Sequence, residues 1–125
     1  MSYSRDEQAT LLSIALDSIN SGLHHGKPVR LNSADYSTPL TAQRASFVTL
    51  KRGETLRGCI GSLEPRTSLV ESIADNAYAA AFSDPRFPEL DASEVEDLTI
   101  EVSVLSPLEP VSVSSEQELL EKMKP

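Results

Sequence analysis

The sequence feature that most constrains the fold is a pair of apolar stretches separated by a turn with glycine at its tip. Residues 45–50 carry apolar side chains on both faces of an extended segment, as a central strand does, and residues 55–60 return after Lys51-Arg52-Gly53-Glu54. The pair predicts a β-hairpin. Alternation of apolar and polar residues predicts a further strand from Asp97 to Leu105.

Three helices are predicted around these strands, because three segments with helical periodicity follow capping sequences of the form Ser-x-x-Glu. The first helix follows Ser4 and ends at Gly22, and the last follows Ser115. The middle one, residues 69–82, is rich in alanine and is expected to lie flat on the sheet. Residues 23–45 are expected to be mostly irregular. The order of elements predicts an α+β fold, with a mixed or antiparallel sheet packed against helices.

The composition limits the classes of function. A chain of 125 residues fits one compact domain, here residues 1–125, and 39% hydrophobic residues are typical of a globular protein. The net charge of −8 disfavours nucleic acid and anionic membranes, because both need clustered Lys and Arg on the protein. We therefore expect an acidic protein that binds neither.

The cysteine count and the N-terminal residues favour the cytoplasm. Cys59 is the single cysteine, so no intramolecular disulfide can form, which fits a reducing compartment. The first seven residues are polar and acidic, unlike a signal peptide, and no apolar run approaches the roughly 18 residues of a membrane span. We expect a cytoplasmic protein.

The stretch from Leu56 to Gly61, Leu-Arg-Gly-Cys-Ile-Gly, carries the strongest chemical signal. In a regular strand Arg57 and Cys59 share one face about 7 Å apart, and a nearby guanidinium lowers the pKa of a thiol. Gly58 and Gly61 would let a ligand approach the backbone. The opposing interpretation is structural and more common, since free cysteines usually act as small hydrophobes and strand glycines often mark a bulge or close packing.

A thiol nucleophile also needs a base, and the only histidines are His24 and His25. Adjacent histidines in a loop usually face solvent, which disfavours a dyad with Cys59. One cysteine and two neighbouring histidines lack the spacing of a structural zinc site, so no metal site is predicted. A mixed metal site that includes Asp84 or Glu101 is the alternative. The sequence does not indicate a cofactor.

Ser83-Asp84-Pro85-Arg86-Phe87 is the second informative stretch. A rigid turn at a helix end would present Asp84 and Arg86 to a substrate in fixed geometry. The bland interpretation is a surface ion pair that stabilises the turn by less than about 1 kcal/mol.

These two stretches and Glu101–Ser106 resemble, in order and spacing, three segments of the AMMECR1 family, whose signature hexapeptide looks like Leu56–Gly61. The resemblance covers most of the chain from about the first helix onward. It implies a two-subdomain α+β fold in which the hexapeptide lines a cleft, the expected functional site. It also implies similarity to component A of a prokaryotic three-protein set, in which a Memo-like protein and a radical SAM protein would be the partners. The family brings no established reaction.

Family domains are longer than this chain. We therefore expect the C-terminal part of the domain, and with it part of the second subdomain, to be missing.

Two functional hypotheses follow. In the first, the chain is an enzyme component that acts on a small polar substrate, with Arg57 and Cys59 as catalytic residues. The residues that would bind the substrate are Gly58, Gly61, Asp84 and Arg86. In the second, it is a non-catalytic interaction or scaffold module. A concave pocket at Cys59 with Arg57 and Asp84 pointing in favours chemistry, and a filled core around a buried Cys59 favours the module.

Overall fold

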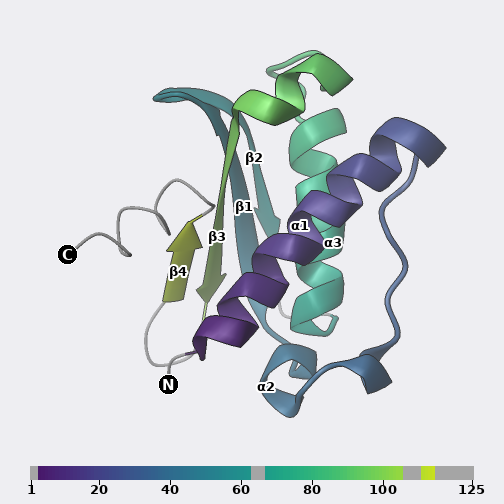
Figure 1. Cartoon of the computed structure of the whole chain (residues 1–125), viewed down its shortest axis with the longest axis vertical. Coiled ribbons are helices and arrows are strands. Elements are labelled where there is room, and N and C mark those ends of the chain that lie inside the picture. Colours follow the sequence, from purple (N-terminus) through teal and green to yellow (C-terminus); the bar gives the residue numbers. More distant parts are fainter. Residues whose placement is uncertain (1–2, 63–66, 106–110, 115–125) are drawn as a thin grey trace.

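The fold is one four-stranded antiparallel sheet with two long helices on one of its faces (Figure 1). The structure is a computed structural model and describes residues 3–62, 67–105 and 111–114. In chain order the strands are β1 (Ala45–Arg52), β2 (Thr55–Ser62), β3 (Leu98–Leu105) and β4 (Val111–Ser114). The helices are α1 (Arg5–His25), the short α2 (Thr38–Thr41) and α3 (Leu69–Phe82), with 3-10 turns η1 (Ser33–Asp35) and η2 (Ala92–Asp97). The predicted α+β class is confirmed.

The sheet has the order β2-β1-β3-β4, and every pair of neighbouring strands is antiparallel. β1 is therefore internal, as its apolar side chains on both faces predicted, and Val48 pairs with Ile60 on one side and Val102 on the other. Gly53 has a φ of 63°, which suits the first position of a tight hairpin turn between β1 and β2. β2 forms one edge of the sheet.

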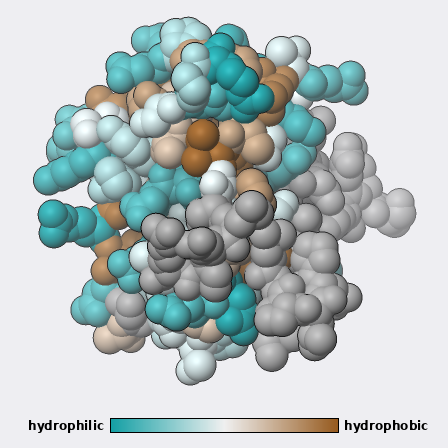
Figure 2. Space-filling view, turned by 180° about the vertical axis from the view of Figure 1, so that it is seen from behind, coloured by the Kyte–Doolittle hydropathy of each residue, from teal (hydrophilic) through white to brown (hydrophobic). Residues whose placement is uncertain are grey.

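The core lies between the sheet and the two long helices. Val48, Ile73, Ala77 and Val102 have no exposed surface, which confirms that α3 covers the sheet with its alanine-rich face. Small side chains allow the helix to approach the strands closely. Seen from behind, the described surface is mainly hydrophilic, with a small hydrophobic patch near its middle (Figure 2).

The first helix begins as predicted and ends later than predicted. The Ser4 hydroxyl accepts the Glu7 N–H at 3.1 Å, and the Glu7 carboxylate accepts the Ser4 N–H at 2.9 Å, which completes the capping box. Gly22 does not stop the helix. The Phe82 ring packs where a side chain at Gly22 would lie, and the helix ends at Gly26, whose φ of 72° is left-handed.

Other differences concern short elements. The segment expected to be irregular contains η1 and α2, and α2 has Pro39 in its first turn, where the missing N–H costs no hydrogen bond. β4 was not predicted, although Val-Ser-Val-Ser alternates as a strand does. The helix predicted after Ser115 lies outside the described residues. Within the described ranges, no helix combines the length and the apolar character that a membrane span requires.

Candidate functional site

The structure brings the hexapeptide and the turn after α3 together at the edge of the sheet. Because β2 is an edge strand, alternate backbone groups face away from β1. The Cys59 N–H donates to Asp84 Oδ2 at 3.1 Å, and Arg86 Nη2 donates to the Cys59 carbonyl oxygen at 3.5 Å. The Asp84–Arg86 turn thus covers the backbone of Cys59 at this edge.

Asp84 and Arg86 form a two-point ion pair. Arg86 Nε and Nη2 lie 3.0 and 2.7 Å from the two carboxylate oxygens, and the Arg86 N–H donates to Asp84 Oδ1 at 3.0 Å. The hydrogen bonds from the Arg86 side chain, opposed by burial and helped by the N–H groups of Arg86 and Cys59, hold the pKa of Asp84 well below its usual range. Asp84 is therefore a fixed anion that accepts hydrogen bonds and has no proton to donate.

The two members of this pair differ in exposure. The Asp84 side chain is 2% exposed, whereas the Arg86 side chain is 56% exposed. The hydrogen bonds with Asp84 raise the pKa of Arg86, and attraction to Cys59 adds a smaller contribution. A rigidly held cation thus faces solvent beside Cys59.

Arg57 lies at a β-bulge. Leu50 pairs with Gly58 and Lys51 pairs with Leu56, which leaves Arg57 without a partner on β1. An extra residue of this kind re-aims side chains and interrupts the alternation of a strand. The prediction that Arg57 and Cys59 share a face assumed a regular strand, which the bulge interrupts. The Arg57 side chain contacts Glu94, and the Cys59 side chain contacts Thr49.

The Arg57 side chain is buried against the segment that leads into η2. Its Nε donates to Glu94 Oε2 at 2.8 Å, and its Nη2 donates to the Pro88 carbonyl oxygen at 2.8 Å. The guanidinium also stacks over the Phe87 ring, 5.8 Å from its centroid. The hydrogen bond from Arg57 lowers the pKa of Glu94 to about 2, against the opposing effect of burial. The charge of Arg57 is therefore balanced within the chain. Its Nη1 is buried and has no hydrogen-bond partner among the described residues.

The Cys59 thiol is half-buried and meets a hydroxyl group. Thr49 pairs with Cys59 across the hairpin, and its Oγ1 lies 3.2 Å from Cys59 Sγ. Either atom can donate in this contact. The thiol thus has a polar neighbour on β1 and a cation, Arg86, beside its own backbone.

Both hexapeptide glycines lie against protein atoms. A Cβ atom at Gly58 would lie 2.1 Å from the carbonyl oxygen of Ala80 in α3, and one at Gly61 would lie 2.0 Å from the Phe47 ring. Packing alone therefore disfavours a side chain at both positions, against helix backbone at Gly58 and against an aromatic ring at Gly61.

The histidines do not join this group. His24 and His25 lie exposed at the end of α1, which is separated from β2 by α3 in Figure 1. Their one ring contact is with each other, at 6.3 Å between centroids. Across the described residues, no three His, Cys, Asp or Glu side chains gather in a way that could hold a metal ion.

The sequence did not predict two contacts of this site, the contact of Thr49 with the Cys59 thiol and the ion pair of Glu94 with Arg57. Glu94 had a signal, because Asp91-Ala92-Ser93-Glu94 has the form of a capping box, and the structure contains that box at η2. The same carboxylate also receives Arg57, from 37 residues away in sequence. Nothing in the local sequence of Glu94 indicates this second partner.

Comparisons with known proteins identify relatives that match this region and most of the chain. The AMMECR1 family model matches residues 12–125. A protein of Methanothermobacter thermautotrophicus is 43% identical over 112 residues, which are 90% of this chain and 58% of that protein. One of Sulfolobus acidocaldarius is 43% identical over 114 residues, or 87% of this chain and 49% of that protein.

A solved structure agrees with these sequence matches. The uncharacterised protein PH0010 from Pyrococcus horikoshii superposes with a TM-score of 0.72 at 37% identity, over 78% of this chain and 50% of its own. The chain thus spans about half the length of the relatives it matches. On sequence and fold together, the chain belongs to the AMMECR1 family.

Proposed function

We propose that this AMMECR1 domain is an enzyme component that holds a small polar, anionic substrate beside Cys59, with Arg86 as the anion-binding group. The observation that carries the proposal is the position of Arg86. Its guanidinium is fixed by a buried carboxylate and hydrogen bonds to the Cys59 backbone, and its side chain is still 56% exposed. A fixed, exposed guanidinium is well suited to bind a carboxylate or phosphate.

In this proposal Cys59 supplies the reactive group. The Thr49 hydroxyl, 3.2 Å from the sulfur atom, can donate a hydrogen bond to it. Among the described residues, none that contacts the thiol is a general base.

Arg57 and Asp84 act through other residues. Arg57 holds Pro88 and Glu94 against β2, and Asp84 holds Arg86 over the Cys59 backbone. Both are positioning residues in this proposal, so Arg57, expected to be catalytic, acts on the site only through Pro88 and Glu94, and Arg86 binds the anion. Gly58 and Gly61 contribute by letting α3 and Phe47 pack against β2.

The test uses the single thiol of the chain. Cys59 is alkylated with iodoacetate, which is anionic, and with iodoacetamide, which is neutral, and the ratio of the two rate constants is measured. We expect Arg86→Gln to lower this ratio by about threefold, in the range of an exposed charge interaction. Arg86→Lys should keep most of the ratio, and Arg5→Gln, an exposed arginine on α1, should leave it unchanged.

Two results would refute the proposal. One is a ratio that does not respond to Arg86→Gln in a variant whose circular dichroism spectrum matches the native protein. The other is a thiol that reacts only after unfolding, because such a thiol cannot meet a substrate.

A second candidate function, a non-catalytic interaction or scaffold module, is favoured by a different observation. The charges of Arg57 and Asp84 are engaged by Glu94 and Arg86 within the chain. The partners in this case are a Memo-like protein or a radical SAM protein, as the family resemblance implies. Calorimetric titration with each purified partner tests it. Unchanged affinity in Cys59→Ser and Cys59→Ala, with an alkylation ratio independent of Arg86, would establish the module.

Both candidates share the same setting. We place residues 1–125 as one domain in the cytoplasm, without nucleic acid or membrane among its partners. The net charge of −8 and the single cysteine support this placement.

A further inference from the structure

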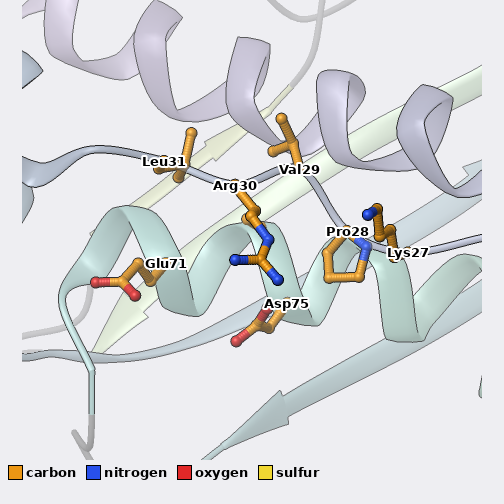
Figure 3. Close-up of a pocket in the computed structure, with 8 residues that line it drawn as sticks. Lys27, Pro28, Val29, Arg30, Leu31, Glu71 and Asp75 are labelled. Carbon is orange, nitrogen blue, oxygen red and sulfur yellow. The ribbon is translucent and has the colours of Figure 1, made fainter. Parts of the chain in front are cut away.

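A hollow lies on the outer side of α3, between this helix and the segment that follows α1 (Figure 3). Residues 27–31 form one wall, and Glu71, Ala74 and Asp75 form the other. Its volume is about 350 Å³, within the range of small-molecule sites. None of the lining residues belongs to the hexapeptide or to the Asp84–Arg86 turn, so the hollow is separate from the site at Cys59.

The wall formed by residues 27–31 is fastened to α3. The buried Ser18 hydroxyl donates to the Ala74 carbonyl oxygen at 2.6 Å and accepts the Val29 N–H at 3.3 Å. The Tyr78 hydroxyl donates to the Gly26 carbonyl oxygen at 2.9 Å, just before the wall begins. These hydrogen bonds, through Ser18 and through Tyr78, connect the segment to α3 at two places. They hold the two walls at a fixed separation, so the hollow is formed before any ligand binds.

The two walls carry opposite charges. Arg30 reaches from the segment toward Asp75 in Figure 3, while Glu71 lies one turn earlier on α3. No ion pair links Arg30 to Asp75 or Glu71 within the described part of the chain. Glu71 accepts the Ser68 hydroxyl at 2.9 Å, so Asp75 is the carboxylate left for a ligand. Burial and the negative charge of Glu71 raise the pKa of Asp75.

We propose that this hollow binds a small zwitterion of the α-amino acid type, with its ammonium group at Asp75 and its carboxylate at Arg30. The ammonium pairs with the Asp75 carboxylate on one wall, and the Arg30 guanidinium on the other wall is suited to pair with a carboxylate. Ala74, Val29 and Leu31 offer apolar surface for a short aliphatic side chain. A ligand with one charge can form an ion pair with only one wall, so we expect the site to prefer ligands that carry both charges.

The test follows backbone amide shifts in ¹⁵N NMR spectra during titration with three matched probes. Norvaline carries both charges, pentanoate lacks the ammonium group, and butylamine lacks the carboxylate. We expect saturable shifts at Val29, Arg30 and Asp75 with norvaline, and affinities weaker by at least about tenfold with either half-ligand.

Variants assign the two charges. Asp75→Asn and Arg30→Gln should each weaken norvaline binding by about tenfold or more. Asp17→Asn and Arg5→Gln change exposed residues of α1 that do not line the hollow, and they should leave it unchanged. Shifts that remain linear to about 10 mM norvaline, a response to pentanoate equal to that to norvaline, or saturable shifts elsewhere in the chain would overturn the proposal.

Discussion

Replacing Gly58 by alanine tests the closest contact between the sheet and α3. The added Cβ would lie 2.1 Å from the Ala80 carbonyl oxygen, whereas ordinary van der Waals contact begins at 3.4 Å. The obstructing atom belongs to the backbone of a helix, so no side chain can rotate away. The helix must therefore retreat by more than an ångström, or β2 must move outward.

The expected cost follows from this geometry. Overpacking a filled core typically destabilises a protein by about 1–3 kcal/mol. Because the added Cβ would meet the helix backbone, which cannot rotate away, we place the cost of Gly58→Ala near the upper end of this range, at about 3 kcal/mol. A gain of roughly 0.4–1 kcal/mol from reduced freedom of the unfolded chain offsets part of this. We expect a net loss of about 2 kcal/mol.

The assay is urea denaturation followed by circular dichroism, with Gly61→Ala as the matched comparison. At Gly61 the obstructing group is the Phe47 ring, a side chain that can shift, so the loss should be smaller than at Gly58. If Gly58→Ala changes the free energy of unfolding by less than about 0.5 kcal/mol, the usual range of surface substitutions, the close approach of α3 to β2 is not rigid and the reasoning fails.

Three further predictions concern polar groups. Ser68→Ala removes the side chain that accepts the Glu71 N–H at the start of α3 and should lower the free energy of unfolding by about 1 kcal/mol, read from the urea midpoint at constant slope. The pKa of Glu94 is lowered from 4.5 to about 2 in the fold, so its ion pair with Arg57 stabilises the protein above pH 4.5, and this stabilisation is lost as the pH falls toward 2. Glu94→Gln should therefore reduce the free energy of unfolding at pH 7 and remove this pH dependence. If the free energy of unfolding has the same pH dependence in both proteins, the ion pair does not stabilise the fold. Asn76 Nδ2 donates to the Ser46 carbonyl oxygen at 3.1 Å in the core, so Asn76→Ala should cost about 2 kcal/mol in thermal unfolding, and a loss within the error of measurement would show that water replaces the amide.

The sequence predicts the layers of this fold because they depend on local patterns. The apolar pattern around Val48 places β1 inside the sheet, and the alanine-rich face around Ile73 and Ala77 places α3 on it. Ser4 marks the start of α1 through a capping box that needs only four residues. Each of these signals lies within one element and carries its own physical cause.

The candidate site depends on contacts that no local pattern contains. Counting back from the turn at Gly53 in a regular hairpin would place Thr49 opposite Gly58, and the bulge at Arg57 shifts it to Cys59. The partner of Arg57 is Glu94, 37 residues away. The assignment of Arg86, rather than Arg57, as the exposed cation follows from burial, which the sequence does not reveal.

The Asp84–Arg86 turn has a consequence for how the sheet ends. At Cys59 it offers an acceptor to the outward N–H and a donor to the outward carbonyl, which is what one residue of a neighbouring strand would offer. An uncovered edge of this kind is a template on which another chain can add a strand. Breaking the Asp84–Arg86 ion pair would uncover these backbone groups of Cys59 and favour the addition of a strand from another chain at β2. An Asp84 variant would then be lost to self-assembly of the protein, whatever role Cys59 has.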